Sequence, residues 1–173
     1  MPTIDTAVSQ LQALGSAAEF ADEIRPILAS LALFEGCSES ESAVLLDYLQ
    51  CFGAGSGATV LQEGDTGDFL IMVLTGRIDV LKADAGATKI VAHIGPGGIL
   101  GEMSLIDGQH RFATCVTREP TDFAVLTRQA LNDILIDHPR LGNKLLLILL
   151  QIMVARLREA TTRMLPTLAS EAI

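Results

Sequence analysis

Positive charge is scarce in this sequence, which has 12 Lys and Arg residues against 21 Asp and Glu and a formal net charge of −9. No cluster of basic residues offsets this excess, so the surface repels nucleic-acid phosphates and we expect no nucleic-acid partner. A small anionic ligand is not excluded, because it needs only one local positive site. Hydrophobic residues make up 49% of the chain, which argues against disorder and for a domain with a real core.

Cysteine is also rare. The three cysteines are Cys37, Cys51 and Cys115, and they form no CxxC pair. This count and spacing exclude a disulfide framework and give no metal-binding pattern, and they are typical of a reduced protein of the cytoplasm.

Long apolar runs and targeting segments are missing as well. The most apolar run, 145–155, is interrupted by Gln151 and is shorter than the roughly 20 residues that a membrane span needs. Residues 1–20 have no basic start and carry acidic side chains, unlike a signal or transit peptide. We therefore expect a soluble, cytoplasmic protein with no membrane partner.

The first part of the chain is expected to be helical, because its apolar residues recur at helical spacing. They are Ile4, Val8, Leu11 and Leu14 up to Gly15, then Phe20, Ile24, Ile27, Leu28 and Leu31, with Pro26 as a kink or helix start. A short helix is predicted to follow, with Ser38 or Ser40 as its N-cap and acidic residues in its first turn.

The texture changes between Gly53 and Thr127, where short β-prone runs alternate with turn residues. The runs read "TVLQ", "FLIMVL", "RIDVLK", "TKIVAHI", "FATCVT" and "DFAVL". Strands at this spacing predict an antiparallel sandwich or barrel rather than βαβ units.

Helical patterns return after the strands. One helix is predicted over 128–137 and a second from about Pro139 to Leu165, with Pro166 ending it. The sequence thus divides into an N-terminal helical extension at 1–32, a helix and barrel at 33–127, C-terminal helices at 128–165, and a tail at 166–173.

The segment "GEMSLIDGQHRFATC" places Glu102 after Gly101, and Arg111 nine residues later. Two interpretations are open from spacing alone. The two charges form a surface ion pair worth about 0–1 kcal/mol, or they are two ends of a pocket. In a pocket, the Arg111 guanidinium suits phosphate oxygens, whereas Glu102 suits a hydroxyl donor because a carboxylate repels phosphate.

The order of these fragments resembles the cyclic nucleotide-binding domain family over about 33–163. The fragments that carry the resemblance are "LFEGCSESE", "VLQEGDTGDFLIMVLTGRIDV", "IGPGGILGEMSL", "HRFATCV" and "HPRL". The resemblance implies an α+β, mainly β fold: an antiparallel β-roll or jelly-roll barrel (double-stranded β-helix) flanked by N-terminal helices and two C-terminal helices. No DNA-binding domain is expected after it.

The resemblance also implies a phosphate-binding cassette at about 101–114 for cAMP or cGMP. Glu102 would bind the ribose 2′-hydroxyl, and Arg111 the cyclic phosphate. The remaining ligand contacts would come from Gly101, Met103, Ser104, Phe112 and Ala113.

Phe112 departs from the family pattern, which has Ala, Ser or Thr after the Arg. Because Phe112 lacks the hydroxyl that reaches guanine in cGMP-selective members, cAMP is the favoured ligand. Its ring is expected either to point into the core, leaving only its backbone at the site, or to narrow or block the pocket. Thr114 either faces the base or is an ordinary strand residue.

Catalysis has little support in the sequence. The histidines His93, His110 and His138 lack the clustered spacing of cupin metal sites, and no nucleophile lies next to a base. We expect no enzymatic activity, no metal and no cofactor apart from the nucleotide ligand.

The last helix is apolar almost all round, so it must be covered on more than one side. Its polar residues are Lys144, Gln151, Arg158 and Thr162 in one narrow stripe, with Arg156 off it. Two covers are open: the same helix of a second subunit in a homodimer, which we favour, or the N-terminal helices of the same chain.

In the family this helix also covers the base, which makes Arg158, Thr161 and Thr162 the candidate base contacts. Ligand binding would move the last helix about a hinge at 137–139 and signal to a protein partner or to the dimer. The alternative is a degenerate barrel that binds no ligand and serves as a dimerisation or interaction module, an interpretation motivated by Phe112.

Overall fold

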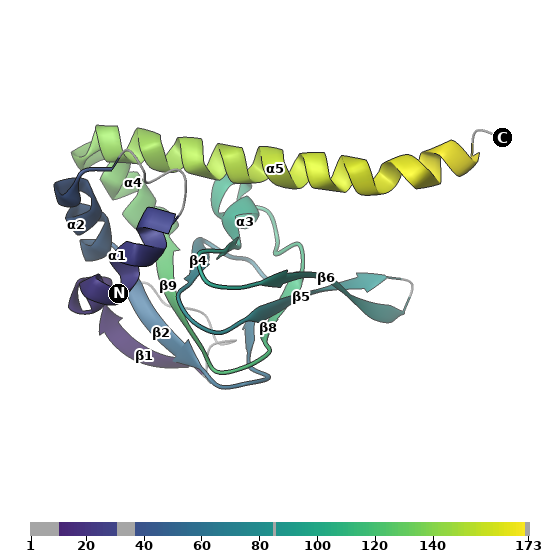
Figure 1. Cartoon of the computed structure of the whole chain (residues 1–173), viewed down its shortest axis with the longest axis horizontal. Coiled ribbons are helices and arrows are strands. Elements are labelled where there is room, and N and C mark those ends of the chain that lie inside the picture. Colours follow the sequence, from purple (N-terminus) through teal and green to yellow (C-terminus); the bar gives the residue numbers. More distant parts are fainter. Residues whose placement is uncertain (1–10, 31–36, 85, 172–173) are drawn as a thin grey trace.

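The computed structural model describes residues 11–30, 37–84 and 86–171 (Figure 1). The predicted helical positions Ile4, Val8 and Leu31 and the proposed boundary at 32–33 lie outside these described residues.

Within these described residues, nine strands form two antiparallel sheets. The five-stranded sheet has the order β1 (Leu11–Ser16), β2 (Gln50–Ala54), β9 (Thr121–Thr127), β4 (Phe69–Val73) and β7 (Ile99–Leu100). The four-stranded sheet has the order β3 (Thr59–Leu61), β8 (Thr114–Thr117), β5 (Ile78–Asp84) and β6 (Ala87–Ile94). The prediction of a mainly β, antiparallel β-roll with flanking helices is confirmed.

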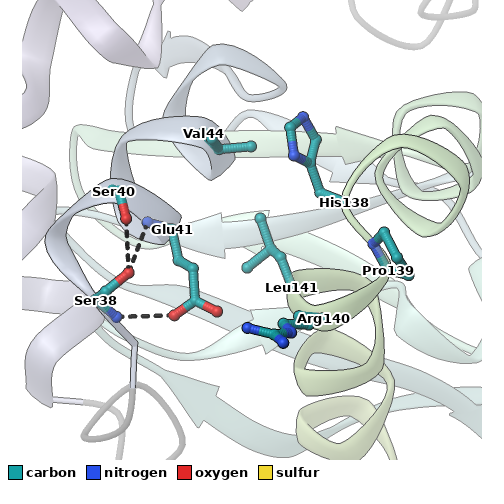
Figure 2. A pocket seen from close by; sticks show the side chains of 8 residues that line it. All are labelled: Ser38, Ser40, Glu41, Val44, His138, Pro139, Arg140 and Leu141. Carbon is teal, nitrogen blue, oxygen red and sulfur yellow. Dashed lines mark hydrogen bonds between the residues drawn. The ribbon is translucent and has the colours of Figure 1, made fainter.

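The helices lie mostly at the two ends of the chain. They are η2 (Ala17–Phe20), α1 (Ala21–Ser30), α2 (Glu39–Asp47), α3 (Glu102–Asp107), α4 (Arg128–Asp137) and α5 (Pro139–Glu171). The predicted cap of α2 is confirmed: the Ser38 hydroxyl accepts from the Glu41 amide, and the Glu41 carboxylate accepts from the Ser38 amide at 2.8 Å (Figure 2).

Strand β4 shows why the β-roll has two cores. Its side chains alternate between faces, and both faces are covered, so nearly the whole strand is buried. Ile71 and Val73 pack between the sheets with Phe123, whereas Leu70 and Met72 pack against the helices.

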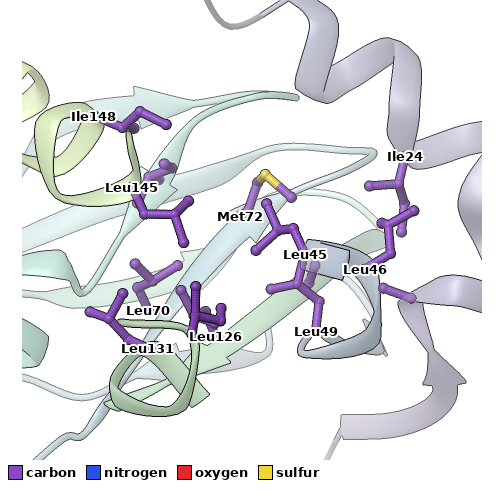
Figure 3. Packing of buried hydrophobic residues seen from close by; sticks show 14 of the residues in the cluster. Ile24, Leu45, Leu46, Leu49, Leu70, Met72, Leu126, Leu131, Leu145 and Ile148 are labelled. Carbon is purple, nitrogen blue, oxygen red and sulfur yellow. The ribbon is translucent and has the colours of Figure 1, made fainter. Parts of the chain in front are cut away.

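The second core joins the helices to the five-stranded sheet (Figure 3). Ile24 of α1 and Leu45 of α2 are buried in one cluster with Leu126 of β9 and Leu145 of α5. The segment 17–30 therefore packs on its own barrel and is not a separate extension.

Two helix predictions are wrong. Residues Leu11–Ser16 form strand β1, which pairs with β2, where the apolar spacing predicts helix. The free edge of β2 supplies hydrogen-bond partners that local spacing does not reveal. Pro166 does not end the last helix either, because α5 continues to Glu171. The φ angle of proline is compatible with a helix, although the missing N–H group costs a helical hydrogen bond. Pro26 similarly lies inside α1.

Helix α5 runs along the molecule and extends well beyond the β-roll toward the C-terminus (Figure 1). Its first part contributes Leu145 and Ile148 to the core. Several of its large apolar side chains are exposed instead: Leu146, Leu147, Leu150, Val154 and Leu157. The alternative cover by the N-terminal helices therefore leaves this face of α5 open.

Candidate functional site

The loop that opens α3 brings the two ends of the predicted cassette together. Gly101 follows β7 and is the N-cap of α3 with φ +78°, a left-handed conformation that favours glycine. A Cβ atom at this position would lie 2.6 Å from Nη1 of Arg111. Glycine at 101 thus allows α3 to begin directly beside the guanidinium.

Arg111 is buried, with only 4% of its surface exposed. Its Nη1 donates to the Gly101 carbonyl at 3.0 Å, and its guanidinium carbon lies 4.5 Å from the centroid of the Phe69 ring. The backbone is fixed as well, since the Arg111 amide donates to the Asp65 carbonyl at 2.7 Å. These contacts hold the side chain in one place without neutralising it.

The carboxylates near this buried charge act on it without pairing with it: Asp68, Glu102 and Asp65 raise the pKa of Arg111 electrostatically, against the larger opposite effect of burial. None of the ion pairs formed among the described residues includes Arg111, and its Nη2 is buried with no hydrogen-bond partner. Burial lowers the pKa of the Arg111 guanidinium from its ordinary value. A buried guanidinium with an unsatisfied donor is costly to the fold, and an anionic ligand would relieve that cost.

Glu102 is fully buried at the start of α3. Its Oε1 is paired with Arg156 of α5, while its Oε2 is buried with no partner. Arg156 also donates to the Ile99 carbonyl of β7. The carboxylate is therefore held from one side and free to accept a hydrogen bond on the other.

Arg156 is the functional residue that sequence reasoning missed. The signal was present, because Arg156 lies off the polar stripe of an otherwise apolar helix. Charged residues at such positions are retained when they have a partner on the face that the helix buries. The ion pair with Glu102 connects α5 directly to the cassette.

The other predicted site residues lie around this pair in different environments. Ser104 and Ala113 are buried, whereas Met103 is exposed. The Thr114 hydroxyl accepts from the Glu63 amide at 3.0 Å and from Gln62 Nε2 at 3.2 Å, which agrees with an ordinary strand residue.

Phe112 does not point into the core, so that prediction is wrong. Its side chain is among the exposed large hydrophobic groups, at 58% exposure, and it does not fill the space beside Arg111. Lys82 of β5 lies against the ring, with Nζ 4.2 Å from the ring centroid. The prediction of a blocked pocket has no support in this arrangement.

The three candidate base contacts on α5 lie apart from the cassette. Arg158, Thr161 and Thr162 are exposed. The Thr161 and Thr162 hydroxyls donate to the Leu157 and Arg158 carbonyls of their own helix. A role for these residues in base recognition stays a prediction.

Two cavities lie elsewhere in the molecule. A hollow of about 620 Å³ separates α2 from the α4–α5 turn (Figure 2), and there Glu41 is already paired with the Ser38 amide and with Lys144. An apolar cavity of about 40 Å³ lies among Leu45, Leu70 and Leu145 (Figure 3). Neither is lined by a buried side-chain polar atom without a partner, whereas the cassette holds two, so the cassette is the candidate site.

The described residues contain neither a candidate metal site nor a membrane-spanning helix. They contain no group of three or more His, Cys, Asp or Glu side chains that could hold a metal ion. Among the described helices, α5 included, none combines the length and hydropathy that a transmembrane segment requires.

Comparison with known proteins agrees with this geometry. The family profile described as "cyclic nucleotide-binding domain" matches residues 54–138. A crystal structure of a cyclic nucleotide-binding domain from Methylobacillus flagellatus is 42% identical, with a TM-score of 0.86 over 95% of this chain and 93% of that one. The chain belongs to the cyclic nucleotide-binding domain family.

Bacterial regulators share this domain. The chain is 29% identical over 139 residues to the CRP-like cAMP-activated global transcriptional regulator of Mycobacterium tuberculosis, covering 80% of this chain and 60% of that protein. It is 32% identical over 132 residues to the cyclic AMP receptor protein of Thermus thermophilus, covering 74% and 58%. The chain thus spans about three fifths of the length of these relatives.

Proposed function

We propose that this protein is a non-catalytic, cytoplasmic sensor of cyclic nucleotides with cAMP as its ligand. Arg111 binds the cyclic phosphate and Glu102 accepts a hydrogen bond from the ribose 2′-hydroxyl. The observation that carries the proposal is a complementary pair of buried atoms without partners: a donor, Arg111 Nη2, and an acceptor, Glu102 Oε2. A nucleoside cyclic phosphate offers an anion for the first and a hydroxyl donor for the second.

The rest of the cassette supports the same ligand. Gly101 lets the backbone approach closely, and the remaining ligand contacts are proposed to come from Met103, Ser104, Phe112 and Ala113. Phe112 has no hydroxyl to offer the guanine base, so we propose that cAMP binds more tightly than cGMP.

Signalling is proposed to run through α5. The Arg156–Glu102 pair ties α5 to the carboxylate that the ribose would engage. Ligand binding changes the environment of this carboxylate, and a ligand that favours one docking of α5 shifts the population toward it. The exposed apolar face of α5 is proposed to carry the response to a second copy of the chain or to a protein partner.

Calorimetric titration of nucleotide-free protein with cAMP and cGMP tests this function. Saturable binding is expected, stronger for cAMP, together with an increase in the thermal unfolding temperature because the ligand binds only the folded state. Absence of binding heat and of a thermal shift at millimolar nucleotide would contradict it. That result would favour the alternative of a ligand-free dimerisation module.

The alternative was motivated by the bulk of Phe112. The Phe112 ring is exposed, so this motivation loses its structural support. Arg111 Nη2 and Glu102 Oε2 both remain without partners.

A further inference from the structure

Phe112 combines high exposure with a fixed position. The Lys82 ammonium that lies against its ring also donates to the Phe112 carbonyl at 2.6 Å and to Glu63 Oε1 at 2.7 Å. The second carboxylate oxygen of Glu63 accepts from the Ala83 amide at 3.2 Å. Lys82 and Glu63 therefore brace the ring in its exposed position.

The polar groups expected to read the base are already engaged within the protein. The Thr114 hydroxyl accepts two hydrogen bonds from the 62–63 segment. The Thr161 and Thr162 hydroxyls donate to carbonyls of α5. In this arrangement, each of these three hydroxyls already makes at least one hydrogen bond within the protein, which leaves it less available to a base.

The position of Phe112 suits a base that leaves the buried part of the site. Glu102, Ser104 and Arg111 form a buried floor. A ligand with its phosphate and ribose on this floor must extend its base outward to the rim. Phe112 follows Arg111 directly, with their Cα atoms about 3.8 Å apart, so its exposed ring is a candidate contact for the part of the ligand that extends out of this floor.

We propose that the phenyl ring of Phe112 is the stacking surface for the base of the bound nucleotide, held in place by Lys82. This inference rests on the proposed function and names how the base is recognised. Stacking uses the faces of the rings and not their hydrogen-bonding edges, so it favours the larger purine system over a pyrimidine. The site selects purine cyclic nucleotides by ring area.

Calorimetric affinities for cAMP and for the pyrimidine analogue cCMP test this role in the full chain. Phe112→Leu keeps apolar bulk but removes the π-face, and should weaken cAMP binding about tenfold or more, as loss of one base–aromatic stack does. It should change cCMP binding less. Phe112→Tyr retains the ring and should keep cAMP affinity within about threefold. Lys82→Met should weaken cAMP binding less than Phe112→Leu, because it only releases the brace.

A spectroscopic measurement on the wild-type protein tests stacking without any variant. Stacking reduces the ultraviolet absorbance of the adenine base, and the chain has no Trp and one Tyr to obscure that band. Saturating protein should lower the adenine absorbance. Wild-type affinity in Phe112→Leu, or unchanged adenine absorbance on binding, overturns the stacking role while the proposed function stands. Failure of the wild-type protein to bind any cyclic nucleotide overturns the proposed function itself.

Discussion

At the scale of single residues, the site is defined by polar atoms that the fold buries without giving them partners. A folded protein normally pairs nearly all such atoms, because each unpaired one costs about 1–3 kcal/mol. Arg111 and Glu102 keep one unpaired atom each, and these atoms are a donor and an acceptor. The stability lost in the free protein is the stability that a matching ligand restores.

Arg111→Met separates the cost of the site from its use. The free energy of cAMP binding should become less favourable by about 2–5 kcal/mol in this variant, as when one side of a buried charge contact is truncated. Its free energy of unfolding without ligand should stay within about 1 kcal/mol of wild type, since an apolar side chain replaces a buried guanidinium with an unsatisfied donor. Calorimetry and thermal unfolding with and without cAMP measure both quantities.

The control for this variant is Arg118→Met, because the Arg118 side chain is largely exposed and lies 4.0 Å from Asp79. It should bind cAMP as the wild-type protein does. Wild-type cAMP affinity in Arg111→Met would exclude Arg111 as the phosphate ligand.

Gly67→Ala is expected to damage the site by contact alone. A Cβ atom at Gly67 would overlap the Arg111 guanidinium, so the guanidinium must move away from its present position. We expect cAMP affinity to fall about tenfold or more. Gly55→Ala is the matched control, because a Cβ atom there meets nothing within 4 Å, and calorimetry should find its affinity unchanged. Equal affinities for the two variants would show that the guanidinium position is not critical.

At the scale of elements, a charged contact joins α5 to the cassette. Arg156 binds both the Glu102 carboxylate and the Ile99 carbonyl, so it bridges α5, α3 and β7. The first part of α5 is fixed by core packing through Leu145 and Ile148. Farther along the helix, Arg163 contacts β6 by donating to the Val91 carbonyl. Small changes at Glu102 can therefore alter how this part of the helix docks.

Arg156→Gln tests the connection. Loss of the pair leaves Glu102 buried with a weakened partner, and we expect unfolding free energy to fall by about 1–3 kcal/mol. Hydrogen exchange of α5 amides should also accelerate in the unliganded protein. The double variant Glu102→Gln/Arg156→Gln should recover part of the stability, because the cycle isolates the coupling between the two side chains.

Arg158→Gln serves as the control for this cycle, since Arg158 is exposed on the same helix. It should leave both unfolding and exchange at wild-type values. Additive effects of Glu102→Gln and Arg156→Gln would contradict the coupling.

At the scale of the whole molecule, α5 has an exposed apolar face that the described part of the chain does not cover. Leu147, Leu150 and Leu157 are each more than half exposed on a helix that extends past the β-roll (Figure 1). An apolar face of this kind is typical of an interface. We expect two copies of the chain to associate through α5.

Leu147→Glu combined with Leu150→Glu places two charges on that face and should convert a dimer to a monomer. Sedimentation equilibrium of the wild-type and variant proteins measures the change. Ile136→Glu on α4 is the control, because Ile136 is equally open to solvent but lies outside α5. A wild-type protein that remains monomeric at micromolar concentration would contradict the prediction.

The sequence by itself determined the features that local chemistry specifies. Short β-prone runs between turn residues predicted an antiparallel sandwich or barrel, which the family resemblance narrowed to a β-roll. Ser38 or Ser40, followed by acidic residues, predicted the start of α2. The step from Glu102 to Arg111 located the cassette through its family resemblance, since these residue types suit the ligand whatever surrounds them.

Only the tertiary structure decided what depends on distant partners. Strand β1 forms because β2 offers a free edge, and α5 passes Pro166 because one lost hydrogen bond does not end a long helix. The structure also decided the burial of Arg111 and the exposure of Phe112, because both depend on which distant residues pack nearby. The contact of Arg156 with Glu102 likewise joins residues far apart in the chain. Spacing along a sequence encodes which face of an element a residue occupies, but not what the fold brings against that face.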